Sequence, residues 1–293
     1  MILGGIHCFS TKNTSMKQSP AERTTLATLR RMARQGDKFA MLTCYDATTA
    51  KWLVSGGVQC LLVGDTAAQM ILGYEHTNQV SIDFMLTITA AVRRGAPNCF
   101  IMGDMPFMSY QADDAEAIRN AGRFMTQGGA DAVKIEVGPD YVDLIRKLVR
   151  ADVPIVAHIG GRPQRFQQVG MPIVAGRTET QVSDLVDLAL KMQDQGVSMI
   201  LIEQSTAEVS DQIVQSVSIP VIGCGAGPAC HGHVIVLHDL LGLTQWQPSF
   251  AQPITEGGTW LADKAAQWVK LVGSGDYLHE DHPYKMNAPS NKI

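Results

Sequence analysis

The sequence predicts an α/β protein folded as a (β/α)8 TIM barrel. Its 293 residues, 45% of them apolar, are enough for one large barrel domain. Short runs of apolar, β-prone residues recur along the chain, and amphipathic segments separate them. These runs are apolar along their whole length, as parallel strands buried on both faces are. Strands of this kind that alternate with helices close into a barrel when eight of them are present.

The elements are predicted in the following order. Helical periodicity begins at Leu26, and Gly36 is a natural end for that helix. Strand-like runs occupy residues 39–46, 60–65, 99–104, 132–136, 154–160, 199–203 and 220–227. Amphipathic helices are predicted at 113–130, 141–153, 180–197 and 260–272. Residues 234–239 (VIVLHD) fit either an eighth strand or the start of a helix.

A doubly wound open sheet is the competing topology. That fold would show a Gly-x-Gly-x-x-Gly turn after an early strand, and none occurs before residue 220. No linker interrupts the repeat, so residues 20–285 are expected to form one barrel domain with terminal helices. Residues 1–19 are expected to be a flexible tail, and residues 286–293 a loose one.

Composition excludes several classes of protein. Lys and Arg total 24 against 28 Asp and Glu, and no basic block occurs, which argues against a nucleic-acid partner. No apolar run approaches the roughly 18–20 residues that cross a bilayer, so no membrane span is expected. The six cysteines show no Cys-x-x-Cys spacing and are interpreted as buried free thiols. A reducing cytoplasm suits them best.

Charged residues cluster at the carboxyl ends of the predicted strands. In a barrel these ends meet at one mouth, where the active sites of barrel enzymes lie. Carboxylates crowded there would repel one another unless a divalent cation were present. The residues at strand ends are Asp65, Asp104, Lys134, Glu136, His158 and Glu203.

This set of side chains suits the chemistry of a 2-oxo acid. Two aspartates, Asp65 and Asp104, fit Mg²⁺, which prefers oxygen ligands and keeps positions open for substrate. Such a cation polarises a carbonyl, so that a base, here Glu203, can remove the neighbouring proton. Lys134 could stabilise the developing negative charge. Structural roles remain open: either aspartate could cap a helix, Lys134 and Glu136 could form an ion pair, and His158 could be a hydrogen-bonded core histidine.

Six segments carry a resemblance to a known family, and they occur in its order over residues 20–285. They read VGDTAAQMILGYEHT (63–77), AVRRGAPNCFIMGDMPFMSY (91–110), GGADAVKIEVG (128–138), VPIVAHIGGRPQ (153–164), SMILIEQ (198–204) and IPVIGCGAG (219–227). On these motifs the chain resembles the ketopantoate hydroxymethyltransferases, also called 3-methyl-2-oxobutanoate hydroxymethyltransferases.

The resemblance implies a fold and a reaction. The fold is a (β/α)8 barrel of the phosphoenolpyruvate mutase and isocitrate lyase superfamily. The reaction is a Mg²⁺-dependent, aldol-type transfer of a hydroxymethyl group from 5,10-methylenetetrahydrofolate to 3-methyl-2-oxobutanoate. It passes through a metal-stabilised enolate and gives 2-dehydropantoate for pantothenate biosynthesis. The resemblance also implies a homo-oligomer, a decamer.

Roles follow residue by residue from the matching motifs. Asp65 and Asp104 would hold Mg²⁺, with Glu136 at its water shell. Substrate would contact Thr66, which stands where the family has serine, as well as Asp65, Asp104 and Lys134. Glu203 would be the catalytic base, and Lys134 and His158 would assist it at the substrate.

The chain departs from the family in its loops. The family's VGDSLGM reads VGDTAAQM from residue 63, its LGLTPQ reads IGGRPQ at 159–164, and its GGYKVQG is replaced at 169–176. Its Asp-Gly-Gln is His-Gly-His at 231–233. These changes leave two alternatives. One is a divergent paralogue that uses the same metal-enolate site for a folate-independent aldol or lyase reaction on another 2-oxo acid. The other is a catalytically silent barrel kept for binding.

Overall fold

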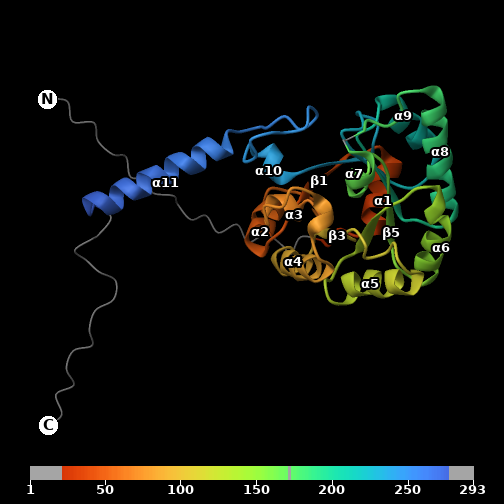
Figure 1. The fold of residues 1–293 in the computed structure, drawn as a ribbon, viewed down its shortest axis with the longest axis horizontal. Coiled ribbons are helices and arrows are strands. Elements are labelled where there is room, and N and C mark those ends of the chain that lie inside the picture. Colours follow the sequence, from red (N-terminus) through yellow and green to blue (C-terminus); the bar gives the residue numbers. More distant parts are fainter. Residues whose placement is uncertain (1–21, 171–172, 277–293) are drawn as a thin grey trace, which may run out of the picture.

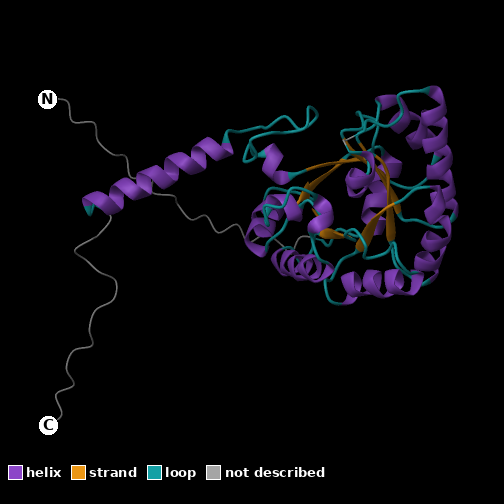
Figure 2. Cartoon of the chain, in the orientation of Figure 1, coloured by secondary structure: helices purple, strands orange, loops and turns teal. Residues whose placement is uncertain are grey.

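The computed structural model describes residues 22–170 and 173–276, so the expected tails at 1–19 and 286–293 lie outside the described residues. Eight parallel strands form a closed barrel in chain order, and β1 pairs with β8 to complete it. This confirms the predicted TIM barrel (Figures 1 and 2). The strands are β1 (Phe39–Thr43), β2 (Cys60–Val63), β3 (Phe100–Asp104), β4 (Ala132–Glu136), β5 (Ile155–Gly160), β6 (Met199–Glu203), β7 (Val221–Cys224) and β8 (Gly232–Ile235).

Helices surround the strands on the outside (Figure 2). The α-helices are α1 (Leu26–Gln35), α2 (Ala47–Ser55), α3 (Ala67–Met70), α4 (Ile82–Gly95), α5 (Asp114–Thr126), α6 (Val142–Arg150), α7 (Phe166–Val169), α8 (Glu179–Asp194), α9 (Ala207–Ser216), α10 (Leu237–Leu240) and α11 (Gly257–Ser274). Short 3-10 turns are η1 (Thr77–Gln79), η2 (Pro139–Tyr141) and η3 (Pro163–Arg165). Several helices begin where a side chain caps them: Asp46 accepts hydrogen bonds from the N–H groups of Thr48 and Thr49, both at 2.8 Å.

The last repeat differs from the others. Both interpretations of residues 234–239 hold in part, because β8 ends at Ile235 and α10 begins at Leu237. Only residues 225–231 connect β7 to β8, which is too short a segment for a crossover helix. Gly225 has a positive φ of 62°, and a Cβ there would lie 2.5 Å from the Phe250 ring. Close packing therefore explains this glycine.

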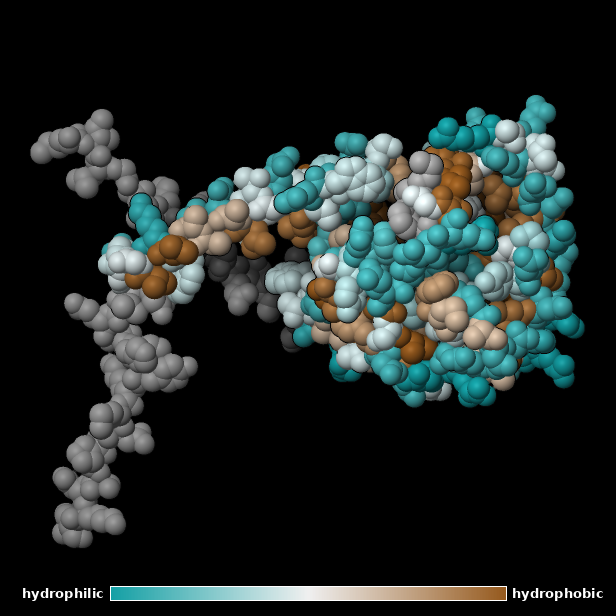
Figure 3. Space-filling view, viewed as in Figure 1, coloured by the Kyte–Doolittle hydropathy of each residue, from teal (hydrophilic) through white to brown (hydrophobic). Residues whose placement is uncertain are grey.

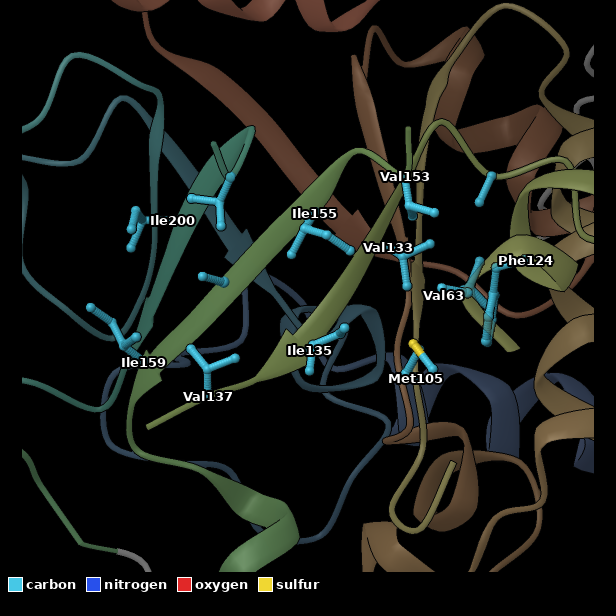
Figure 4. Packing of buried hydrophobic residues seen from close by; sticks show 14 of the residues in the cluster. Val63, Met105, Phe124, Val133, Ile135, Val137, Val153, Ile155, Ile159 and Ile200 are labelled. Atoms are coloured by element: carbon cyan, nitrogen blue, oxygen red, sulfur yellow. The ribbon is translucent and has the colours of Figure 1, made fainter. Parts of the chain in front are cut away.

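The outward side chains of the strands form the main core with the helices (Figure 4). Val133 and Ile135 of β4 and Ile155 of β5 point outward and are fully buried. Phe124 of α5 reaches the backbone of β3, where a Cβ at Gly103 would lie 2.5 Å from its ring. This layer anchors the helices to the sheet.

The inward side chains alternate with the outward ones and change character along each strand. Near the amino ends they are apolar, and Leu29 of α1 closes this end of the barrel. Inward apolar residues include Met41, Met102, Val156, Met199 and Ile222. Near the carboxyl ends the inward positions of β3, β4, β5 and β6 are polar. The barrel interior therefore has an apolar layer below and a polar layer at the mouth.

Helix α11 extends away from the barrel (Figure 1). Every residue from Thr259 to Ser274 is exposed, and apolar side chains lie along this projecting helix (Figure 3). Among residues 22–170 and 173–276, none of the helices has the length and apolar character needed to cross a bilayer.

Candidate active site

A cavity of about 230 Å³ opens at the carboxyl-end mouth of the barrel. Every site residue that the sequence predicts lines this cavity. They are Asp65, Thr66, Asp104, Lys134, Glu136, His158 and Glu203. The polar layer of the barrel is therefore the floor of one pocket.

Strand register places these side chains next to one another. Asp104 of β3 is paired with Lys134 of β4, and Glu136 of β4 with His158 of β5. Lys134 Nζ lies 2.8 Å from Asp104 Oδ1, and the backbone N–H of Asp65 donates to Asp104 Oδ2 at 2.9 Å. Lys134 thus forms its ion pair with Asp104 rather than with Glu136. Asp65 and Asp104 cap none of the described helices.

His158 is held as a neutral ring. Lys134 Nζ lies 3.2 Å from His158 Nδ1, and because an ammonium can only donate, Nδ1 is the acceptor. The ring proton is then on Nε2, which lies 3.5 Å from Glu203 Oε2. Burial, together with the Lys134 charge, lowers the pKa of His158 well below its usual value. His158 therefore presents an N–H toward Glu203.

Burial shifts the carboxyl groups of Asp104 and Glu136 toward their protonated forms. It raises the pKa of Asp104 to about 8, with Lys134 opposing the rise and the Asp65 charge adding to it. Burial likewise raises the pKa of Glu136 well above its usual value. An additional positive charge in the cavity would favour the ionised forms of both.

Glu203 differs from the other acids in its accessibility. Its side chain is 21% exposed, whereas those of Asp104 and Glu136 are 1% and 4% exposed. Burial raises its pKa to about 7, Lys134 opposing the shift and Asp65 adding to it. A carboxyl group that faces the cavity and titrates near neutrality is suited to accept a proton.

Two contacts at the site were not anticipated from the sequence. Tyr45 Oη lies 2.6 Å from Thr66 Oγ1, so a buried phenol positions the threonine hydroxyl. Gln164 Nε2 donates to Asp65 Oδ2 at 3.0 Å. Tyr45 lies within the strand-like run 39–46, and Gln164 ends the motif at 153–164, but neither residue type signals such contacts by itself.

The donor set fits a magnesium ion. Within the described parts of the chain, no three or more His, Cys, Asp or Glu side chains are grouped as a metal cluster. Mg²⁺ needs fewer protein ligands, because it keeps several waters. Two buried aspartates supply oxygens of the right kind, and the backbone N–H of Asp65 donates to Asp104 Oδ2. Glu136 Oε2 is also buried and lacks a hydrogen-bond partner among the described residues. Asp65 and Asp104 could hold the ion directly, and Glu136 could accept from its water.

One wall of the cavity is apolar. It consists of Leu62, Val234, Val236, Trp246 and Phe250. A substrate bound at the polar floor would place a small hydrocarbon group against this wall. The wall derives largely from β8 and the segment after α10, so the irregular last repeat shapes the pocket.

Fold and site together define a class, the closed (β/α)8 barrels with a cluster of ionisable side chains at the carboxyl-end mouth. Two solved structures with this fold cover 89% of the chain, and it covers 92% of each of them. They are 2,3-dimethylmalate lyase (TM-score 0.56, 18% identity) and phosphoenolpyruvate phosphomutase from Streptomyces platensis subsp. rosaceus (TM-score 0.59, 13% identity).

Sequence comparison then identifies the family. The ketopantoate hydroxymethyltransferase family model matches residues 23–280. A 3-methyl-2-oxobutanoate hydroxymethyltransferase of Hyperthermus butylicus is 40% identical, covering 88% of the chain and 90% of that protein. One from Clostridium novyi is 37% identical, covering 90% and 97%. The chain belongs to the ketopantoate hydroxymethyltransferase family, which confirms the predicted family and enzyme class.

Proposed function

We propose that the chain transfers a hydroxymethyl group from 5,10-methylenetetrahydrofolate to 3-methyl-2-oxobutanoate and so forms 2-dehydropantoate. Family membership supports the reaction. The observation that carries the proposal is the gathering of all seven candidate side chains in one cavity of about 230 Å³. That volume suits a five-carbon oxo acid with its hydrocarbon end against the apolar wall.

The proposed binding roles follow from the contacts. Asp65 and Asp104 would hold Mg²⁺, which when bound supplies the Lewis acidity that polarises the keto group. Lys134 balances the charge of Asp104 and faces the same space. The Thr66 hydroxyl, held by Tyr45, would donate to the substrate carboxylate.

Glu203 would remove the proton from the carbon next to the keto group. Its pKa of about 7 allows it to be ionised, yet basic, near neutral pH. His158 Nε2, which has no hydrogen-bond partner among the described residues, lies 3.5 Å from Glu203 Oε2 and would donate to this carboxylate if the two moved closer. The resulting enolate of the oxo acid would form a carbon–carbon bond to the methylene carbon of the folate, and both carbon–nitrogen bonds of that carbon would break. Water would supply the hydroxyl group, and the remaining water proton and the proton taken up by Glu203 would go to the two nitrogens of the departing tetrahydrofolate.

A two-stage assay tests the proposal. Purified protein with Mg²⁺, 3-methyl-2-oxobutanoate and 5,10-methylenetetrahydrofolate should form 2-dehydropantoate. Without folate, the same oxo acid should exchange its proton with deuterated solvent. Proton exchange without formation of 2-dehydropantoate would favour the divergent paralogue. If a panel of oxo acids gave neither exchange nor product, the enolate chemistry would be rejected.

We also infer self-association through α11. Leu261, Ala265, Val269 and Val272 lie on one face of this helix, while Asp263, Gln267 and Lys270 lie on the other. Leu261 and Val269 are 57% and 70% exposed. Within residues 22–170 and 173–276, the short α10 is the one helix between β8 and α11, so α11 of a second copy could cover the barrel wall beside β8.

Light scattering on the full chain tests this inference. The expected particle is a homo-oligomer, with a decamer as the size the family implies. Leu261→Asp should reduce the mass because it places a charge on the apolar face. Gln267→Asp, on the opposite face, is the matched control. A monomeric wild-type protein would contradict self-association.

We propose a cytoplasmic compartment on the basis of the cysteines. Cys44, Cys60, Cys99, Cys224 and Cys230 are free thiols. Free thiols support the proposal of a reducing, cytoplasmic environment.

A further inference from the structure

Gln164 is a buried amide on the loop after β5, within η3. We propose that Gln164 is a positioning residue that fixes the carboxylates of Asp65 and Glu136 for metal and substrate binding. This inference rests on the proposed function. It adds a component supplied by a loop, outside the strand ends from which the other candidate residues come.

The side chain of Gln164 uses its full hydrogen-bonding capacity. Its Nε2 donates to Asp65 Oδ2 at 3.0 Å and to the Met105 carbonyl at 2.9 Å. Its Oε1 accepts from Tyr110 Oη at 2.8 Å and from Gln111 Nε2 at 3.3 Å. Both partners of Nε2 can only accept, so the amide has a single orientation that satisfies them.

The backbone of Gln164 acts on a second carboxylate. Its N–H donates to Glu136 Oε1 at 3.2 Å, which leaves Glu136 Oε2 turned elsewhere and without a hydrogen-bond partner among the described residues. One loop residue therefore holds an acid from the end of β2 and another from β4. Rotation of either carboxylate would break one of these hydrogen bonds.

A neutral donor is the appropriate chemistry at this place. The cavity is already lined by five carboxyl groups and one lysine. A carboxylate at position 164 would have the same shape as the amide, yet it would direct an acceptor at Asp65 Oδ2 and at the Met105 carbonyl. Lone pairs would then oppose lone pairs, so Asp65 would turn away from its present position.

Manganese binding tests the role without requiring turnover. Mn²⁺ alone is titrated into the full chain and its dissociation constant measured by electron paramagnetic resonance. Gln164→Glu and the neutral Gln164→Met should each raise the constant about 10- to 100-fold, as loss of outer-sphere partners does. Gln168→Glu is the matched control, since Gln168 lies four residues further on, is exposed, and contacts Arg165 instead. This control should bind Mn²⁺ as the wild type does.

Kinetics and folding separate the outcomes. If Gln164 acts through the metal, added Mg²⁺ should restore much of the activity of Gln164→Met. A lowered melting temperature with an unchanged dissociation constant for Mn²⁺ would overturn the positioning role. Wild-type protein that binds no Mn²⁺ would instead reject the proposed metal-dependent function. Because the two variants differ in charge, folding of either one is sufficient for the test.

Discussion

The lower and upper layers of the barrel interior are formed by inward-facing residues of the same strands, but the two layers differ in chemical character. On β3, Met102 and Asp104 are successive inward residues, and both are buried. On β6, Leu201 and Glu203 stand in the same relation. The lower member of each pair is apolar and packs in the core. The upper member is ionisable and faces the cavity.

This difference shows how one strand pattern serves stability and chemistry together. Burial of apolar surface in the lower layer stabilises the fold by about 25 cal/mol per Å². The upper layer buries ionisable groups, and the raised pKa values of Asp104 and Glu203 show that their charged forms are disfavoured there. A single step of two residues along a strand therefore separates a stabilising position from a functional one.

The sharpest test of the upper layer is Glu203→Gln. The amide keeps the shape of the side chain but cannot accept the substrate proton. Solvent deuterium exchange into 3-methyl-2-oxobutanoate should fall about 100- to 10,000-fold, the usual contribution of a positioned base. Mn²⁺ affinity should be unchanged, in contrast with Asp104→Asn, which should weaken it. Near wild-type exchange would remove Glu203 from the role of base.

The lower layer is tested by Met102→Ala. Truncation of this fully buried side chain should lower the free energy of unfolding by about 2–5 kcal/mol, measured by chemical denaturation. Exchange activity of the folded protein should persist, because Asp104 keeps its ion pair with Lys134. Met102→Leu, which conserves volume, is the control and should cost less than about 1.5 kcal/mol. Loss of activity in folded Met102→Ala would show that the layers are not independent.

A pH series measures how much burial of Glu203 in the upper layer destabilises the folded protein. Burial raises the pKa of Glu203 from 4.5 to about 7, so the folded state favours the protonated carboxyl. The stability that this group contributes is complete below pH 4.5 and is lost as the pH rises through 7. With metal removed by a chelator, the free energy of unfolding of Glu203→Gln should exceed that of the wild type by on the order of 3 kcal/mol well above pH 7. If Glu203→Gln does not become more stable relative to the wild type as the pH rises, the raised pKa of Glu203 is contradicted.

The smallest effect concerns an aspartate outside both layers. Asp46 is the last residue of the strand-like run 39–46, as Asp65 is of the run 60–65, but Asp46 caps α2. Asp46→Ala should lower the unfolding free energy by about 0.5–2 kcal/mol and leave exchange activity intact. Asp46→Asn, which retains a capping oxygen, should recover most of that loss. A loss of activity in the alanine variant would extend the site to β1.

The fold was predictable because its signals are local. Runs such as 132–136 and 199–203 coincide with β4 and β6, since strands buried on both faces are apolar throughout. The eighth strand was ambiguous because only a short loop precedes it and α10 follows at once. Helix α11 was expected from its periodicity, but nothing in the pattern indicated that it leaves the barrel.

The charged part of the site was also predictable, because parallel strands bring their carboxyl ends to one mouth. The pairing of Lys134 with Asp104 was not, since it depends on register across two strands. The roles of Tyr45 and Gln164 depend on loops that fold back over the pocket. A tyrosine or glutamine in a loop carries no periodic signal, so only the tertiary structure reveals such contacts.

Closure of the barrel by β1 and β8 has a consequence for how copies of this chain meet. Each of the eight described strands is paired on both sides, so none offers a free row of N–H and C=O groups to another molecule. Edge-to-edge aggregation, a hazard for open sheets, is thereby blocked in the folded barrel. Any contact between copies must instead use helices and loops, where single surface substitutions can tune it.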